Sequence, residues 1–100
     1  MNDNQDNQTK KNWLVYMLRC ADDSLYTGIT NDLEKRLETH NAGKGARYTR
    51  ARLPVKVVYQ ELVENRSSAS IREYQLKQLS RSEKQRLLQK FSGSSLTTKQ

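Results

Sequence analysis

The chain has 100 residues, of which 18 are Lys or Arg and 11 are Asp or Glu, giving a formal net charge of +7. This length is enough for one domain and excludes a multidomain protein. No stretch approaches the roughly 18 to 20 apolar residues of a membrane-spanning helix, and the polar N-terminus lacks a signal peptide's apolar segment, so we expect a cytoplasmic protein. The single cysteine, Cys20, excludes an internal disulfide, and with only His40 to help it no Cys/His zinc site can form.

Both ends of the chain are polar. Residues 1–12 contain no apolar side chain after Met1, and residues 92–100 contain one. Neither end can therefore offset the entropic cost of ordering. We expect two disordered tails around one folded domain at residues 13–91.

Positive charge is concentrated in two segments of that domain. Residues 80–91 have a basic excess, and residues 43–52 carry four cations and no acid, namely Lys44, Arg47, Arg50 and Arg52. A compact domain with such segments attracts a polyanion because binding releases counterions. The expected partner is nucleic acid; the alternative is a basic protein that is merely soluble.

Two apolar runs of strand length open the domain. Residues 13–20 and 25–30 are separated by turn-forming residues 21–24, which predicts a β-hairpin. Both alternating faces of the first run are apolar, so we expect helices on both sides of the sheet. Tyr16 and Tyr26 can share a face only with a turn of three or five residues or with a bulge, and we expect one of these.

The first helix is expected at residues 32–42. Asn31 and Glu34 have the spacing of a capping box, and Gly43 is a typical helix stop. The glycine-containing, aperiodic stretch 43–53 is expected to be a surface loop that contacts the nucleic-acid backbone.

The second half of the domain begins at Pro54. Proline has no N–H to donate a ladder hydrogen bond, and this loss is tolerated best at the start of a strand. We expect this strand at residues 55–63. A second helix is expected at residues 67–79, and a capping box of Ser80 and Glu83 opens a third helix that ends at Phe91. The predicted order is β-β-α-β-α-α.

Two polar residues lie near the buried side of the first helix. The apolar stripe is set by Leu33 and Leu37; His40 lies about 20° from it and Arg36 about 60°, with one turn between the two polar residues. A solvated arginine and a structural histidine would explain each residue taken alone.

Glu73 lies about 40° from Ala69 on the buried stripe of the second helix. An unpartnered carboxylate there costs several kcal/mol, so Glu73 should have a counterion, and a divalent cation is one solution. Two alternatives are an ion pair with Lys77, worth about 0.2 to 0.5 kcal/mol, and a capping box with Ser70 if the helix begins late.

Tyr16 and Tyr26 stand on the two strands of the hairpin, and Gly28 marks a place where another group can approach the backbone closely. The two hydroxyl groups can therefore lie together. Packing alone also explains strand tyrosines.

Together these residues resemble the GIY-YIG nuclease family. Its two signatures resemble residues 14–16 and 26–28, its Arg-x-x-x-His spacing resembles Arg36 and His40, and its metal-binding glutamate resembles Glu73. The resemblance covers residues 13 to about 90 and is closest to the bacterial stand-alone, single-domain YhbQ/YazA-like proteins. It implies an α+β fold with a three-stranded antiparallel sheet flanked by helices.

The resemblance implies a metal-dependent endonuclease that hydrolyses phosphodiester bonds in DNA, or in RNA, during DNA repair or processing. Glu73 would hold one Mg²⁺ or Mn²⁺, Arg36 would neutralise the scissile phosphate and His40 would orient or shuttle a proton. We assign Tyr26 as the base and Tyr16 as the residue that positions the water. The residues expected to contact nucleic acid are Gly28, Lys44, Arg47, Arg50 and Lys77.

Two positions depart from the family pattern: Leu14 replaces the first glycine, and no asparagine follows Glu73. The alternative function is a nucleic-acid-binding domain of the same fold with weak or no cleavage. A third is a non-enzymatic interaction protein that uses Ile71 and Tyr74. We expect a monomer with no membrane attachment.

Overall fold

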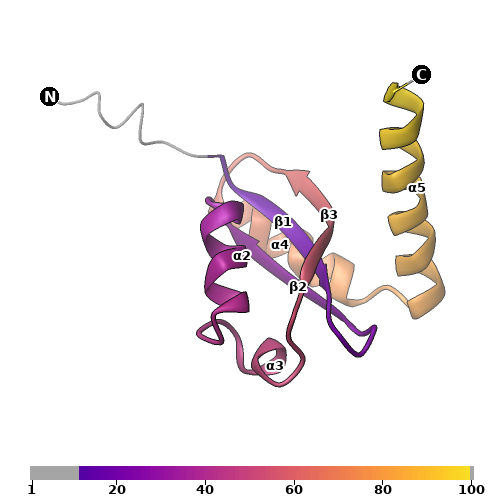
Figure 1. The fold of residues 1–100 in the computed structure, drawn as a ribbon. Coiled ribbons are helices and arrows are strands. Elements are labelled where there is room, and N and C mark those ends of the chain that lie inside the picture. The colour runs from indigo at the N-terminus through magenta and orange to yellow at the C-terminus, as the bar shows by residue number, and fades with distance from the viewer. Residues whose placement is uncertain (1–11, 100) are drawn as a thin grey trace, which may run out of the picture.

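A three-stranded antiparallel sheet forms the centre of the computed structural model (Figure 1). Strand β1 spans Leu14–Arg19, β2 spans Leu25–Thr30 and β3 spans Lys56–Leu62, in the spatial order β2-β1-β3. The structure describes residues 12–99, with side chains up to residue 92, so the expected N-terminal tail lies outside the described residues except for its last position. The predicted α+β class and the order β-β-α-β-α-α are confirmed, with one additional short helix.

The turn between β1 and β2 has five residues, 20–24. The register pairs Tyr16 with Gly28 and Leu18 with Tyr26, so both tyrosines point to the same face of the sheet. This confirms the expected odd-numbered turn. The strand ends one residue earlier than predicted because Cys20 belongs to the turn, where its N–H donates to the Ser24 carbonyl at 2.9 Å.

Helix α2 spans Leu33–Asn41 and begins at a different cap from the one predicted. The Asp32 carboxylate accepts a hydrogen bond from the Lys35 N–H at 3.2 Å. The expected capping box of Asn31 and Glu34 is therefore wrong by one residue. Gly43 follows the helix with φ of 78°, a conformation that favours glycine, which confirms the predicted stop.

The stretch 43–53 is not simply a loop, because it contains the short helix α3 at Arg47–Arg50. Tyr48 and the two arginines are exposed, whereas Thr49 is buried. The Thr49 hydroxyl donates to the Ala46 carbonyl at 2.9 Å, which stabilises this turn. Hydrophobic periodicity cannot reveal such a polar contact, and for this reason the loop prediction is wrong here.

Helix α4 spans Arg66–Lys77 and is capped by Asn65, whose side chain accepts from the Ser68 N–H at 2.8 Å. Because α4 begins four residues before Ser70, the alternative capping box of Ser70 with Glu73 is excluded.

Helix α5 spans Arg81–Lys99 and opens with the predicted capping box. The Ser80 N–H donates to a Glu83 carboxylate oxygen at 2.8 Å, and the Glu83 N–H donates to the Ser80 hydroxyl oxygen at 3.1 Å. The helix continues past Phe91, where we expected it to end. No proline follows Phe91, and a glycine such as Gly93 weakens a helix by only about 1 kcal/mol.

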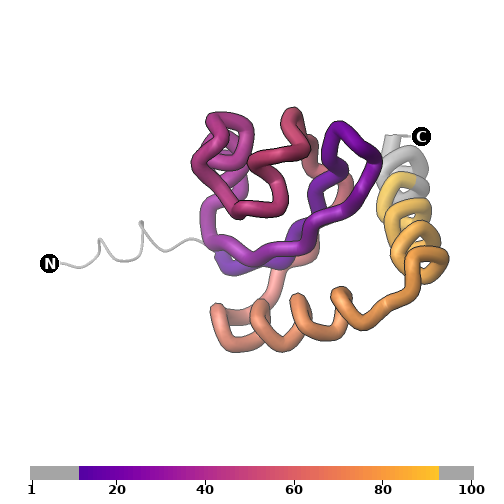
Figure 2. Tube along the Cα trace, turned by 90° about the horizontal axis from the view of Figure 1, so that it is seen from below, coloured from indigo at the N-terminus to yellow at the C-terminus, as the bar shows by residue number. Residues whose placement is uncertain are grey.

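Apolar clusters lie on both faces of β1, as predicted. Figure 2 shows α2 and α3 on one side of the sheet and α4 on the other. The cluster beneath α4 and α5 contains Val15, Met17, Ala69, Leu76 and Leu88. The cluster beneath α2 contains Leu14, Tyr16 and Leu18, with Leu33 and Leu37 packed against it. No helix within residues 12–99 is long and apolar enough to cross a membrane.

Candidate active site

Tyr16 and Gly28 face each other across β1 and β2. A Cβ atom built on Gly28 would lie 2.6 Å from the Tyr16 hydroxyl oxygen and 2.8 Å from its Cζ. The phenol ring therefore lies directly against the glycine backbone, an approach that any larger residue would prevent. The close approach expected at Gly28 is thus made by a side chain of the protein itself.

His40, in the last turn of α2, connects β1 with α3. Its Nε2 lies 3.0 Å from the Tyr16 hydroxyl oxygen, and its Nδ1 lies 2.9 Å from the Thr49 hydroxyl oxygen. Tyr16 and His40 are each 1% exposed and Thr49 is 0% exposed. A continuous chain of buried polar groups therefore runs from the sheet through α2 to α3.

Burial shifts the titration of both rings toward their neutral forms. Burial, with a contribution from Tyr26, raises the pKa of Tyr16 above its usual value; Arg36 opposes this shift and Glu73 adds to it. Burial and the positive charge of Arg36 lower the pKa of His40. Both side chains are therefore uncharged near neutral pH.

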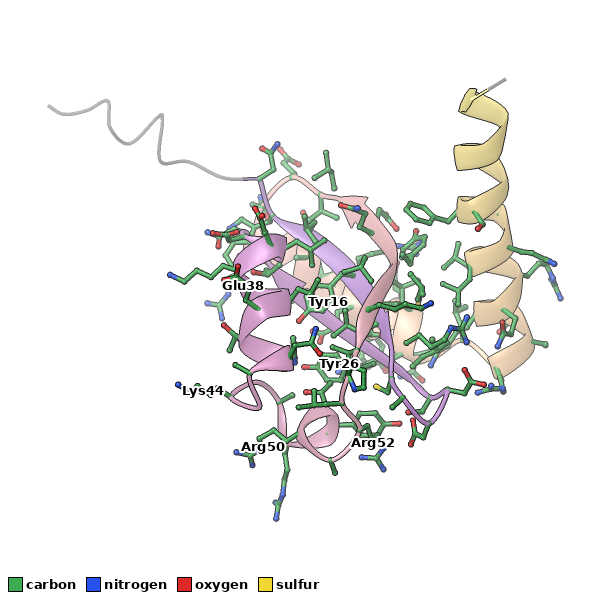
Figure 3. The ribbon with its side chains drawn as sticks, in the orientation of Figure 1. Tyr16, Tyr26, Glu38, Lys44, Arg50 and Arg52 are labelled. Carbon is green, nitrogen blue, oxygen red and sulfur yellow. The ribbon has the colours of Figure 1, made fainter. Side chains whose placement is uncertain are left out.

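Tyr26 completes an aromatic cluster with these rings. Its ring centroid lies 6.4 Å from that of Tyr16 and 5.3 Å from that of His40. On α3, Tyr48 stacks on Tyr26 with a centroid distance of 6.2 Å and an interplanar angle of 23°. Tyr26 is only half-buried, so the cluster meets solvent at this residue. Figure 3 shows Tyr16 and Tyr26 between α2 and the lower part of the sheet.

Arg36 lies one turn before His40 on α2 and is exposed. Its guanidinium has no ion pair or hydrogen bond with any residue in the described part of the chain. Its charge lowers the pKa of both Tyr16 and His40, and the i, i+4 spacing on α2 places its side chain next to His40. An unpaired guanidinium beside neutral groups is suited to bind a phosphate.

Glu73 lies on α4, which packs against β1 and the edge strand β2. Its charge makes a small contribution to the raised pKa of Tyr16, although the Tyr16 side chain and α4 lie on opposite faces of the sheet. The carboxylate is 24% exposed and lies 3.2 Å from the Lys77 ammonium group. The ion pair considered from the sequence is therefore present.

The acidic residues around the site do not form a closed metal cage. Within residues 12–92, no group of three or more His, Cys, Asp or Glu side chains is placed to hold a metal ion. Mg²⁺ is commonly bound by one or two carboxylates together with waters and substrate phosphates. The half-buried Glu73 carboxylate fits such a shared site.

The cations of the 43–53 stretch differ in their surroundings. The Arg52 side chain donates to the Asp22 carboxylate at 3.0 Å and its guanidinium lies 3.9 Å from the centroid of the Tyr48 ring, so Arg52 is held in place. Three other cations are exposed and form no ion pair with a described residue: Lys44, Arg47 and Arg50. Lys44 and Arg50 project from the end of the molecule that holds α3 (Figure 3).

Sequence reasoning missed three residues around His40. Thr49 contacts Nδ1, Tyr48 stacks on Tyr26, and a Cβ on Gly45 would collide with the His40 ring. The two glycines of the 43–53 stretch favoured a surface loop that contacts the nucleic-acid backbone. A lone threonine or tyrosine between arginines carries no signal in a single sequence.

Comparison with known proteins agrees with this fold. The profile of the GIY-YIG catalytic domain matches residues 12–87. A UPF0213 protein of Clostridium perfringens is 57% identical over 74% of this chain and 80% of its own length.

Two solution NMR structures are also similar. A UPF0213 protein from Bacillus halodurans is 42% identical with a TM-score of 0.51, covering 78% of this chain and 83% of that one. A protein from E. faecalis is 41% identical with a TM-score of 0.57, covering 83% and 88%. By sequence and by fold, this chain belongs to the GIY-YIG family, in its UPF0213 group of small stand-alone proteins.

Proposed function

We propose that this protein is a divalent-metal-dependent endonuclease that hydrolyses phosphodiester bonds in DNA during repair or processing. The observation that most supports this function is the unpaired Arg36 guanidinium beside the hydrogen-bonded pair of Tyr16 and His40. The guanidinium is suited to bind a phosphate, and the hydrogen-bonded pair is suited to transfer a proton.

Phosphodiester hydrolysis needs an activated water, stabilisation of the charged phosphate and help for the leaving oxygen. Arg36 would hold the scissile phosphate through its guanidinium. Glu73 would hold Mg²⁺ or Mn²⁺, and the bound ion would supply charge stabilisation at the phosphate and at the leaving oxygen. Binding of the ion would require Glu73 to exchange its ion pair with Lys77.

The route of the water's proton distinguishes the two tyrosines. A phenol with a pKa near 10 is ionised in about one molecule in a thousand at pH 7, and burial raises the pKa of Tyr16 further. Tyr16 can therefore accept a proton only while it passes its own proton to another group. The neutral His40 Nε2 at 3.0 Å is such a group. The Tyr26 hydroxyl has no hydrogen-bond partner among the residues that the structure describes.

We therefore assign the proton-accepting role to Tyr16 with His40, instead of Tyr26 as expected from the sequence. A proton of the water moves to the Tyr16 oxygen as the phenol proton moves to His40, and the resulting hydroxide attacks phosphorus while the bond to the leaving oxygen breaks. Because Tyr16 is 1% exposed, the water must be admitted next to it when substrate binds. The half-buried Tyr26 positions that water.

The second candidate is a nucleic-acid-binding domain of the same fold with weak or no cleavage. The ion pair of Glu73 with Lys77 favours it, because the carboxylate that would hold a metal already has a counterion. The exposed cations Lys44, Arg47 and Arg50 support binding equally in both functions.

The test is cleavage of single-stranded, duplex and branched DNA by the full chain in Mg²⁺ or Mn²⁺. Tyr16→Phe and Glu73→Gln should lower cleavage by about 10²- to 10⁴-fold and leave binding at low salt intact. Tyr74→Phe is the matched control, because this tyrosine lies exposed on the surface of α4.

Three other outcomes decide against parts of the proposal. Equal cleavage by the wild type and all the variants would indicate a contaminating nuclease. If Tyr26→Phe loses cleavage while Tyr16→Phe keeps it, Tyr26 and not Tyr16 is the general base. Salt-dependent binding without cleavage of any substrate would establish the second candidate.

A further inference from the structure

The Thr49 hydroxyl lies between two polar partners in the interior of the protein. Its oxygen is 2.9 Å from His40 Nδ1 and 2.9 Å from the Ala46 carbonyl oxygen. A carbonyl can only accept a hydrogen bond, and a hydroxyl has a single proton to donate. If Thr49 donates to Ala46, it must accept a hydrogen bond from the N–H at His40 Nδ1.

Two arrangements of protons are possible along this chain when the imidazole is neutral. In the first, the Tyr16 hydroxyl donates to Nε2, Nδ1–H donates to Thr49, and Thr49 donates to the Ala46 carbonyl. Every proton then has an acceptor. In the second, Thr49 donates to Nδ1 and Nε2–H donates to the Tyr16 oxygen.

The second arrangement leaves the buried Tyr16 proton without an acceptor among the described residues. An unmet hydrogen bond of a buried hydroxyl is costly. The Ala46 carbonyl loses less in that arrangement, because it still accepts the N–H groups of Thr49 and Arg50 at 3.1 Å. The geometry therefore favours the first arrangement.

We propose that Thr49 is a positioning residue that holds His40 as the Nδ1–H tautomer and thereby leaves Nε2 free to accept the Tyr16 proton. The value of this tautomer for cleavage rests on the function proposed above. The tautomer itself does not depend on that function, because it follows from hydrogen bonds within the protein.

The surroundings of His40 support this role. Tyr16 faces the ring from β1, Tyr26 faces it from β2 and Arg36 lies beside it on α2. Gly45 packs so closely that any Cβ at this position would collide with the ring. No carboxylate of the described residues forms a hydrogen bond with either ring nitrogen. Thr49 is therefore the only described partner of Nδ1.

The test uses the fact that His40 is the only histidine in the chain. In full-length protein labelled with ¹⁵N-histidine, the two imidazole nitrogens give one set of signals whose shifts report the tautomer. At pH 8 the wild type should show a protonated Nδ1 and an unprotonated Nε2, with at least about a tenfold preference for this tautomer.

The matched variants are Thr49→Val, which removes the hydroxyl but keeps the shape, and Thr49→Ser, which keeps the hydroxyl. Thr49→Val should lower the Nδ1–H to Nε2–H ratio by about fivefold or more, because Nδ1–H loses its acceptor. Thr49→Ser should retain the wild-type shifts. Cleavage should follow the tautomer through kcat, with DNA binding unchanged.

Two results would overturn the proposal. One is a wild-type spectrum that shows the Nε2–H tautomer. This result contradicts the proposal even if Thr49→Val does not fold. The other is a folded Thr49→Val protein with the tautomer ratio of the wild type. If the wild type shows the Nδ1–H tautomer but cleaves no DNA, the proposed function fails and the role of Thr49 in fixing the tautomer stands.

Discussion

Replacement of Gly28 with alanine should separate Tyr16 from His40 while the protein stays folded. The new Cβ would lie 2.6 Å from the Tyr16 hydroxyl oxygen, whereas ordinary contacts begin at 3.4 Å. The phenol ring must therefore move by about 0.8 Å, since it has no flexible end that could yield. A shift of this size away from His40 lengthens the 3.0 Å contact beyond the 3.5 Å limit of a hydrogen bond.

The cost in stability is moderate. Overpacking of a core costs about 1 to 3 kcal/mol, and the loss of a strand glycine recovers about 0.5 to 1 kcal/mol through the unfolded state. We expect a net loss of about 0 to 2.5 kcal/mol in the free energy of unfolding, against the roughly 5 to 15 kcal/mol typical of a domain. Cleavage should nevertheless fall by about 10²- to 10⁴-fold, because Tyr16 loses its proton acceptor.

Urea denaturation and cleavage of the same preparations measure the two effects. Leu88→Val is the control, because it costs about 1 kcal/mol in the cluster on the opposite face of β1, and none of the proposed site residues belongs to that cluster. Equal losses of cleavage in both variants would mean that stability alone is responsible. Full cleavage by Gly28→Ala, with unchanged His40 ¹⁵N shifts, would refute the reasoning from close contact.

Three further predictions concern pH, salt and capping. Because the pKa of His40 is lowered from 6.5 in the folded protein, the unfolded chain takes up its proton first as the pH falls. The free energy of unfolding should therefore decrease below pH 6.5, by at most about 1.4 kcal/mol per pH unit, and level off below the folded pKa; urea titrations of His40→Gln should lack this step. Replacing Lys44, Arg47 and Arg50 with alanine should reduce the slope of log affinity against log salt by about 0.9 for each lost phosphate contact, measured by fluorescence anisotropy with duplex DNA; an unchanged slope would remove these residues from the interface. Ser80→Ala should cost about 1 kcal/mol in urea denaturation without affecting cleavage, and no loss would show that the cap of α5 is unimportant.

The sheet and the paired tyrosines could be predicted because both follow from the two-residue period of a strand. Apolar residues on both alternating faces of β1 required cover on both sides, and the structure shows two clusters. Because of the same period, Tyr16 and Tyr26 share a face of the sheet only if the turn has an odd number of residues or a bulge is present. The five-residue turn places both tyrosines on one face.

The details that could not be predicted depend on polar contacts between distant residues. Arg50 and Arg52 look alike in the sequence, but Arg52 alone is held by Asp22, which lies 30 positions earlier. Asn31 and Asp32 are neighbours with similar capping preference, so the sequence could not decide between them. Thr49 acquires its role only because α2 ends where the His40 ring can reach it.

The placement of β1 between the two apolar clusters has a consequence for cooperativity. The cluster that contains Tyr16 and the cluster beneath α4 and α5 share this one strand, so neither half has a core that could persist alone. None of the residues to which we assign a role in cleavage lies on α5, yet its Leu88 packs in the cluster that contains Val15 and Met17, the neighbours of Tyr16 along the strand. Amide hydrogens throughout β1 should accordingly exchange only through global opening, as one unit with the buried residues of α4.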